Sequence, residues 1–437
     1  MRSKHIFLCT GLLLLQGVHA VQAQDDIKES EVKRIISTLA SDEMRGRATF
    51  TPDIQRASAF LEKEFAKAGL QPLPGAKGFR QELAIYKLSP VSVQLQINGV
   101  AAPAKNVIYQ AGASHLAWTQ NSHVDIQKIG AGDEFMTSLR KHLHYTQNTV
   151  LWIDAKFAAD FERVKRYFEG GALEKLDTGK NIIMILQRPE DSAITSFDVR
   201  VDQKIETSAL NNVVGVLPGK SKKSEYVVFS GHYDHLGILA PDASKDSIAN
   251  GADDDASGTT AVVTLAKHFH DLHNNERTLI FVAFAAEEIG GYGSHYFSRQ
   301  LDADSVVAMF NIEMIGKESK FGVNTAFITG FDRSDFGTIL QNNLKGSVFH
   351  FYPDPYPEQN LFYRSDNATL ARLGVPAHTI STDQIDKDPL YHSVKDEVAS
   401  LNITNITNTI KAIAISATGI ISGKETPTRI DKSKVTN

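Results

Sequence analysis

Cysteine is almost absent from this chain of 437 residues, whose single cysteine is Cys9. Cys9 lies within the apolar run 6–15, which follows a basic start and precedes the small residues of 18–23. This order is typical of a secretory signal peptide, and we expect residues 1–23 to be removed by cleavage after Ala23. The mature chain would then reach the periplasm or the extracellular space without a cysteine, which excludes disulfides and thiolate chemistry.

Long hydrophobic runs and an excess of one charge are lacking as well. The run 6–15 is half of the roughly 20 residues that span a bilayer, which disfavours a retained anchor, and no later segment is long and apolar enough to cross a membrane. The formal net charge is −5, with neither a basic excess that suggests nucleic acid nor an acidic block that suggests a solvated tail. We therefore expect no nucleic-acid partner and no membrane insertion after signal cleavage.

The length of the chain and the change in its hydrophobic pattern along the sequence indicate one large α/β domain with an insertion. Helical periodicity runs through residues 26–71, and buried strands return after about residue 205. We assign residues 24–90 and 206–437 to the main domain and residues 91–205 to an inserted α+β subdomain.

Within the insertion, the segment 91–97 alternates like a half-buried antiparallel strand, and the short strands 149–153 and 181–186 flank an amphipathic segment. His142 and His144 have a spacing that metal ligands can have. Isolated surface histidines are commoner, so the insertion is expected to contribute no metal ligand.

Three apolar runs in the second half of the chain each end in residues that bind divalent metals. They are 226–231 before His232-Tyr233-Asp234, 278–286 before Glu287-Glu288, and 306–310 before Asn311-Ile312-Glu313. Short apolar runs separated by helical patterns are typical of buried parallel strands. Because ligands bind at the carboxyl ends of such strands, the three strand ends are expected to meet at one site.

His232 and Asp234 can serve the same site in different ways. A metal-bound imidazole usually donates its other N–H to a carboxylate, which fixes its orientation, and Asp234 is spaced for that role. The pattern alone is weak evidence, because solvated turns also contain it. His235 fits such a turn better than a metal site.

Asp253, Asp254 and Asp255 stand together between small residues, at the start of the amphipathic segment 258–269. Carboxylates at a helix start are explained by capping and by the helix dipole, but capping needs one or two of them. A third suggests a carboxylate that bridges two cations. The residues alone leave both explanations open.

Glu287 and Glu288 form an adjacent pair directly after a long apolar strand. Such pairs are common on exposed helices, but at the end of a buried strand two charges are costly unless they are used. One carboxylate can bind a metal while its neighbour takes the proton from an attacking water.

Five motifs together carry a family resemblance: His232-Tyr233-Asp234, Gly251 to Gly258, Ala286-Glu287-Glu288, Asn311-Ile312-Glu313-Met314 and Tyr391-His392-Ser393. In order and spacing the chain resembles the co-catalytic zinc aminopeptidases of metallopeptidase family 28, typified by bacterial leucyl aminopeptidase. The resemblance covers residues 206 to about 420 well and 30–85 more loosely. It implies a three-layer zinc exopeptidase fold with a mostly parallel central sheet flanked by helices, and some relatives carry a protease-associated domain where this chain has its insertion.

Carried over position by position, the resemblance implies two zinc ions per chain. His232 would bind one of them and Asp254 would bridge both. Glu288 and His392 would bind the second zinc. Glu313 stands where many relatives have Asp and would complete the shell of the His232 zinc.

The resemblance also implies catalytic and supporting roles. Glu287 matches the general base, and Asp234 matches the partner of His232. Asp396 would support His392 in the same way, whereas Asn367 stands where relatives have His. The aromatic-rich loop 349–363 is expected either to line a substrate pocket or to pack on itself.

The sequence therefore predicts a zinc-dependent metallopeptidase, most simply an aminopeptidase that acts on peptides through metal-activated water. Two alternatives use the same scaffold: a metallo-carboxypeptidase or dipeptidase, and an N-terminal glutaminyl cyclase. A receptor-like relative without catalysis is disfavoured, because every ligand and the base are present in position.

Overall fold

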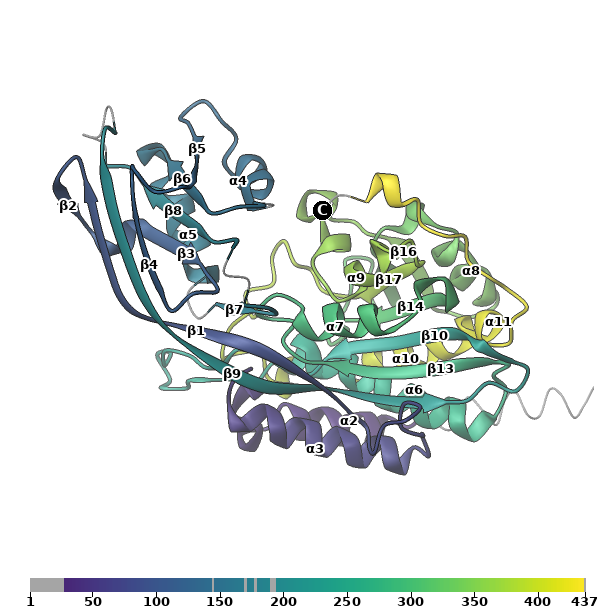
Figure 1. The fold of residues 1–437 in the computed structure, drawn as a ribbon. Coiled ribbons are helices and arrows are strands. Elements are labelled where there is room, and N and C mark those ends of the chain that lie inside the picture. The colour runs from purple at the N-terminus through teal and green to yellow at the C-terminus, as the bar shows by residue number, and fades with distance from the viewer. Residues whose placement is uncertain (1–26, 144, 169–170, 177–178, 189–193, 436–437) are drawn as a thin grey trace, which may run out of the picture. The chain divides into compact units, whose positions relative to one another are not determined.

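The computed structural model describes residues 27–143, 145–168, 171–176, 179–188 and 194–435 (Figure 1). The predicted signal peptide lies outside these residues. The chain divides into two compact units, of which the first combines the chain up to Leu83 with the chain from Asn211 onward, and the second is Ala84–Leu210. The sequence placed the corresponding boundaries at residues 91 and 205.

The first unit is built on a mixed, mostly parallel sheet. Its strands in sheet order are β16 (His350–Pro353), β15 (Thr325–Ile328), β17 (Ala377–Ser381), β14 (Val306–Ile312), β10 (Lys222–His232), β13 (Arg277–Phe284) and β9 (Phe197–Leu217). Strand β10 pairs in parallel with both β13 and β14, and β14 pairs in parallel with β17. Strands β9 and β15 run antiparallel to their neighbours β13 and β17. The expected fold class is thereby confirmed.

The three strands expected to carry the site are neighbours in this sheet. Every residue of β13 is buried, and the ring of Phe229 on β10 stacks on Phe281 of β13 and Phe310 of β14, with centroids 5.4 and 4.7 Å away. Apolar side chains on adjacent strands thus bind the strands into one core layer. Because the strands are parallel, their carboxyl ends come to the same edge of the sheet.

Helices cover both faces of this sheet, as Figure 1 shows. They are α2 (Glu29–Leu39), α3 (Pro52–Lys67), α6 (Gly258–Leu272), α7 (Tyr292–Gln300), α8 (Phe336–Asn343), α9 (Asn367–Ala371), α10 (Ile403–Ser416) and α11 (Thr418–Ile421). Helix α2 buries Val32, Ile35, Ile36 and Leu39, which is the face expected from its periodicity. No helix in the described part of the chain has the length and apolar character to cross a membrane.

The second unit contains its own four-stranded sheet and two helices. The sheet order is β3 (Val107–Gln110), β8 (Ile182–Leu186), β6 (Thr149–Ile153) and β5 (Asp125–Ile129), and the helices are α4 (Phe135–Leu143) and α5 (Ala158–Phe168). One face of this sheet packs on α4 and α5 through a core that includes Phe135 and Phe161. The other face packs on a second layer of strands within the same unit, through Trp118, Trp152 and Phe197.

Those strands are the amino-terminal part of β9 together with β1 (Arg80–Ile97), β2 (Val100–Ala102) and β4 (His115–Thr119), and β7 (Ala172–Leu173) pairs with β1. The expected strand at 91–97 exists but begins earlier, at Arg80, and turns at Asn98 and Gly99 into β2.

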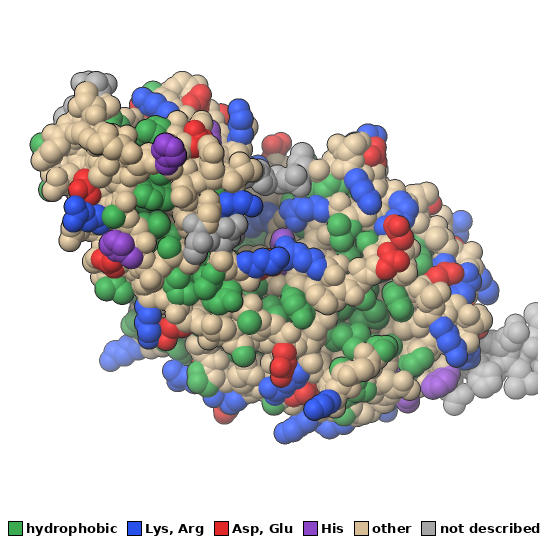
Figure 2. Space-filling model, in the orientation of Figure 1, with side chains coloured by type: hydrophobic (Ala, Val, Ile, Leu, Met, Phe, Trp, Pro, Cys, Tyr) green, Lys and Arg blue, Asp and Glu red, His purple; other side chains and the backbone are tan. Residues whose placement is uncertain are grey.

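On the surface shown in Figure 2, basic and acidic side chains are interspersed, in keeping with the small net charge of −5.

Candidate metal centre

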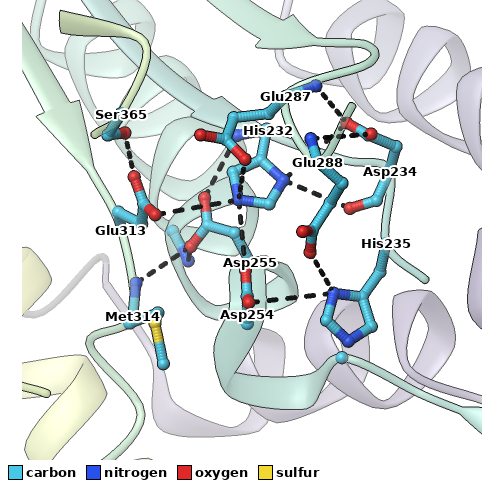
Figure 3. Close-up of polar contacts among 12 residues, drawn as sticks. His232, Asp234, His235, Asp254, Asp255, Glu287, Glu288, Glu313, Met314 and Ser365 are labelled. Atoms are coloured by element: carbon cyan, nitrogen blue, oxygen red, sulfur yellow. Dashed lines mark hydrogen bonds and ion pairs between the residues drawn. The ribbon is translucent and has the colours of Figure 1, made fainter. Parts of the chain in front are cut away.

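His232 is the last residue of β10, and its ring is fully enclosed, with 1% of the side chain exposed. Its Nδ1 lies 3.1 Å from the main-chain oxygen of Asp234. Because a carbonyl oxygen only accepts, Nδ1 donates to it, which leaves Nε2 to face the centre. That Nε2 lies 3.2 Å from Oδ1 of Asp254 (Figure 3).

Asp254 places its two carboxylate oxygens toward two different histidines. Oδ1 faces His232, whereas Oδ2 lies 3.3 Å from Nε2 of His392. Ligand atoms of His232, Asp254 and Glu313 all lie within 4.8 Å of one another. Asp254 thus occupies the middle position that the sequence assigned to a bridging carboxylate.

Glu288 is the second carboxylate on the His392 side. Its Oε2 lies 3.2 Å from Nε2 of His392, and its Oε1 lies 2.6 Å from Nδ1 of His235. His235 is fully buried, so the expectation that it lies in a solvated turn is wrong. A second His three residues after His232 is the sequence signal for it, because only the fold brings the ends of β10 and β13 together.

Asp253 and Asp255, on either side of Asp254, accept hydrogen bonds from main-chain N–H groups. Asp255 accepts hydrogen bonds from the main-chain N–H groups of His232 (3.1 Å), Gly258 (3.0 Å) and Met314 (3.1 Å), so it joins the ends of β10 and β14 to the start of α6. Asp253 accepts the N–H of Gly316 at 2.7 Å. These two carboxylates are therefore used by the backbone, which leaves Asp254 for the centre.

Asp396 differs from its expected role. Its carboxylate accepts the N–H groups of Asp253 and Asp254, each at 3.0 Å, and so fixes the segment that carries the bridging residue. The sequence had placed it behind His392, on spacing alone. The hydrogen bonds instead link it across the fold to residues more than one hundred positions earlier in the chain.

Asp234 also acts by a route other than the expected one. Its carboxylate lies 3.8 Å from Nδ1 of His232 but accepts the N–H groups of Glu287 and Glu288, at 3.1 and 3.3 Å. The imidazole is oriented by the main-chain oxygen of Asp234 instead. One fully buried residue thereby positions His232 and both glutamates.

Glu287 and Glu313 lie on the His232 side of the centre. Each has a carboxylate oxygen 4.0 Å from Nε2 of His232, and Ser365 donates a short hydrogen bond to Glu313. Burial, together with the charges of Glu313 and Asp366, raises the pKa of Glu287 well above its usual range. A carboxyl group with a raised pKa can both accept and return a proton near neutral pH.

Arg47 supports the centre from outside. Its guanidinium is completely buried and donates to the main-chain oxygens of Leu39 (2.6 Å), Tyr233 (2.8 Å), Asn250 (2.6 Å) and Gly251 (3.1 Å). These carbonyls belong to α2, to the end of β10 and to the segment before Asp254. The loose resemblance at 30–85 included this residue but gave it no role.

The aromatic loop packs mainly on its own surroundings. Phe362 is buried in the core beside His378, and the ring of Tyr356 makes an edge contact with Phe327, with centroids 5.7 Å apart. Asn367, which replaces the His of relatives, donates to the main-chain oxygens of Phe362 and Ala377 at 3.1 and 3.2 Å. These contacts attach the loop to β17 and β15 of the first unit, which neither of the two expectations for the loop had stated.

The donor set fits zinc. Nε2 of His232 is buried and has no hydrogen-bond partner in the described part of the chain. It faces a carboxylate oxygen of Asp254 across 3.2 Å, and a cation bound by both groups would lie between them. Two imidazoles and two further carboxylates surround the carboxylate of Asp254, and zinc accepts ligands of both kinds.

The comparison with known families assigns this part of the chain. Residues 212–417 match the family model described as Peptidase family M28. These residues belong to peptidase family M28. The M28 segment contains every residue that the sequence predicted for the metal centre, from His232 to His392, while the second unit ends before the segment begins.

Among relatives of the M28 segment, Leucine aminopeptidase 1 of Ajellomyces capsulatus is 27% identical over 205 residues, which cover 45% of this chain and 52% of that protein. A probable zinc metalloprotease of Pyrenophora tritici-repentis is 34% identical over 112 residues, which cover 25% of this chain and 23% of that protein. The chain thus spans about half the length of the first of these relatives.

Two solved structures resemble the whole chain in fold. An aminopeptidase from Aneurinibacillus sp. strain AM-1 has a TM-score of 0.57 at 16% identity, with 95% of this chain and 98% of that chain covered. A zinc aminopeptidase from Bacillus subtilis has a TM-score of 0.54 at 14% identity, with 94% and 99% covered. At these identities the likeness shows the fold alone.

Proposed function

We propose that the protein is a zinc-dependent aminopeptidase that holds two zinc ions per chain and releases N-terminal residues from peptides. The observation that carries this proposal is the carboxylate of Asp254, whose oxygens lie 3.2 Å from Nε2 of His232 and 3.3 Å from Nε2 of His392. A carboxylate shared in this way fits one ion on each side. The relatives of the M28 segment, a leucine aminopeptidase and a probable zinc metalloprotease, support the same proposal.

The ligands divide into two sets. His232, Asp254 and Glu313 would hold one zinc, and Asp254, Glu288 and His392 would hold the other. Bound zinc would supply Lewis acidity, which polarises the scissile carbonyl and lowers the pKa of the attacking water. Because Glu313 is one methylene longer than the Asp of many relatives, its hydrogen bond from Ser365 is what fixes the position of its carboxylate.

Glu287 is the group that moves the proton. It lies beside His232, yet its main chain is held by Asp234, so its carboxylate is positioned without being needed as a ligand. Glu287 takes a proton from the attacking water and passes it to the nitrogen of the departing peptide.

The charge around the centre favours a free amine over a free carboxylate in the substrate. Glu287, Glu313 and the buried Asp366 lie close enough for their charges to act on one another. A peptide α-ammonium is attracted by such a group of carboxylates, whereas a C-terminal carboxylate is repelled. This charge is the reason for placing the aminopeptidase before the carboxypeptidase.

The test is a comparison of leucine p-nitroanilide, its N-acetylated form and a peptide with N-terminal Gln, each with and without a chelator. Hydrolysis of the free-amine substrate, loss of that hydrolysis with the chelator and its return with zinc are expected. Equal hydrolysis of the N-acetylated substrate, or cyclisation of the Gln peptide without cleavage, would overturn the aminopeptidase assignment.

Metal analysis of zinc-saturated protein should give two ions per chain, and one ion at full activity would contradict the bridging role of Asp254.

We also propose that the enzyme acts in the periplasm or outside the cell. The signal-like pattern of residues 1–23 and the lack of cysteine beyond Cys9 support this location. Fractionation of cells that express the full chain, with amino-terminal sequencing of the product, would test it. An uncleaved product in the cytoplasm would contradict it.

A further inference from the structure

A second group of carboxylates lies apart from the proposed zinc ligands. It consists of Asp253, Asp383 and Asp388, whose oxygens include one from each residue within 4.8 Å of the others. Asp253 is 0% exposed and Asp383 is 3% exposed. The residues come from two segments, because Asp253 precedes α6 and the other two follow β17.

Most polar atoms in this group are used. One oxygen of Asp253 accepts the N–H of Gly316 at 2.7 Å, and one oxygen of Asp388 accepts the N–H of Leu390 at 2.9 Å. The ammonium of Lys317 lies 3.3 Å from the other oxygen of Asp253 and forms a short contact with Asp388. Lys317 thus accounts for one positive charge among three carboxylates.

Asp383 is the exception. Neither oxygen of its buried carboxylate accepts a hydrogen bond from an N–H or a hydroxyl group among the described residues, and carboxylate oxygens of Asp253 and Asp388 lie within 4.8 Å. A buried carboxylate without a donor is strongly disfavoured, and two like charges beside it make its ionised form less favourable still. Burial and these neighbouring charges raise the pKa of Asp383 to about 8. The group therefore lacks positive charge at the position of Asp383.

We propose that Asp253, Asp383 and Asp388 bind a calcium ion at a site separate from the zinc centre. The donors of this group are carboxylate oxygens, with neither imidazole nor thiolate among them. Hard cations with flexible coordination, calcium above all, are held by such oxygen sets, whereas zinc favours nitrogen and sulfur. One divalent ion balances the charge that Lys317 leaves unpaired.

Calcium at this position would link two segments of the chain that also carry proposed zinc ligands, one with Asp254 and the other with His392. Asp253 is bonded directly to Asp254 in the chain, and Asp388 stands four residues before His392. A cation held by both segments fixes His392 relative to Asp254. The site is thus a structural one, and its existence does not depend on the proposed peptidase activity.

The test uses the full chain loaded with zinc and titrated with calcium chloride or magnesium chloride. Thermal melting and isothermal calorimetry should show one saturable calcium site with a higher melting temperature, and a weaker response to magnesium. Asp383→Asn should raise the Kd for calcium at least about tenfold, because it removes one ligand charge. Asp386→Asn, on the exposed part of the same loop, is the matched control and should bind calcium like the wild type.

A second set of measurements distinguishes a bound calcium ion from a proton that Asp383 and Asp388 share. Asp383→Asn removes an unpaired charge, so without calcium this variant should be at least as stable as the wild type, which keeps it foldable. Terbium should give luminescence sensitised by Tyr356, whose pKa is raised by burial and by the nearby charges of Asp386 and Asp383, and calcium should compete with terbium. No saturable calcium binding in the wild type, or equal binding in Asp383→Asn, would overturn the proposal and leave a proton shared by Asp383 and Asp388. Binding and melting are measured without substrate, so an inactive enzyme would not affect the outcome.

Discussion

Nδ1 of His235 lies 2.6 Å from Oε1 of Glu288, and both side chains are buried. The other oxygen of Glu288 is the one that approaches His392, at 3.2 Å. His235 therefore fixes the direction of a carboxylate whose opposite oxygen would bind metal. Hydrogen bonds of this kind orient ligands and tune their affinity.

His235→Ala is expected to weaken zinc binding on the Glu288 and His392 side by roughly 10- to 100-fold, which is the usual effect of removing a partner of a metal ligand. Competition with a chromogenic chelator measures this change. His123→Ala, at an exposed position of the second unit, is the control and should leave zinc affinity unchanged. Unchanged affinity in His235→Ala would show that Glu288 keeps its direction without this contact.

The two adjacent glutamates are expected to respond differently to substitution by Gln. Glu288→Gln removes a charged ligand, so zinc content, melting temperature and activity should all fall, because metal binding and folding are coupled. Glu287→Gln should keep zinc and stability near wild type while the rate falls by roughly 10² to 10⁴ through loss of proton transfer. If Glu287→Gln lost zinc and Glu288→Gln kept it, their roles would be exchanged.

Arg47→Lys tests the buried guanidinium that binds four carbonyl oxygens. Lys keeps the charge but cannot reach those oxygens in the same geometry, so buried carbonyls are left without a donor. Urea unfolding should show a loss of about 3 kcal/mol or more. Arg45→Lys lies on the same turn with 54% of the Arg45 side chain exposed, and its change should stay within about 0.5 kcal/mol. Similar losses in both variants would argue against a special role for Arg47.

His378 gives the protein a specific dependence on pH. Burial lowers the pKa of His378 to about 4, whereas in the unfolded chain it returns to about 6.5. Between these values the unfolded chain binds a proton that the folded chain does not, so the stability present above pH 6.5 is lost as the pH falls toward 4. His378→Gln should lose about 2 kcal/mol less than the wild type between pH 7.5 and 5. Urea unfolding of both proteins at the two pH values measures the difference, and equal losses would contradict it.

The sequence predicted the parts of the site that depend on one strand and its end. His232, Glu288 and Glu313 each follow an apolar run, and the parallel pairing of β10, β13 and β14 brings them together as expected. Asp254 and His392 follow no such run, and their roles came from the family resemblance. For the three residues at strand ends, the deciding information was the local pattern of an apolar run followed by a metal-binding residue.

Contacts between distant segments were not predictable in this way. The hydrogen bond from His235 to Glu288 depends on how two strand ends approach, and the carboxylate of Asp396 reaches Asp253 and Asp254 across the fold. Spacing in the chain suggested a solvated His235 and an Asp396 behind His392. Strand β1 was also longer than expected, because its residues from Arg80 onward alternate too weakly in hydrophobicity to mark its start.

The separation of the proposed ligands along the chain has a consequence for the order of folding. His232, Asp254, Glu288, Glu313 and His392 follow or precede different strands, and the sheet must pair β10 with both β13 and β14 before they meet. Contacts between distant parts of a chain form slowly, because closing long loops costs entropy before any contact forms. Zinc therefore cannot serve as an early nucleus for this protein. It would bind after the sheet has formed and would act mainly by slowing unfolding, so its effect belongs to the lifetime of the folded state rather than to the speed with which that state is reached.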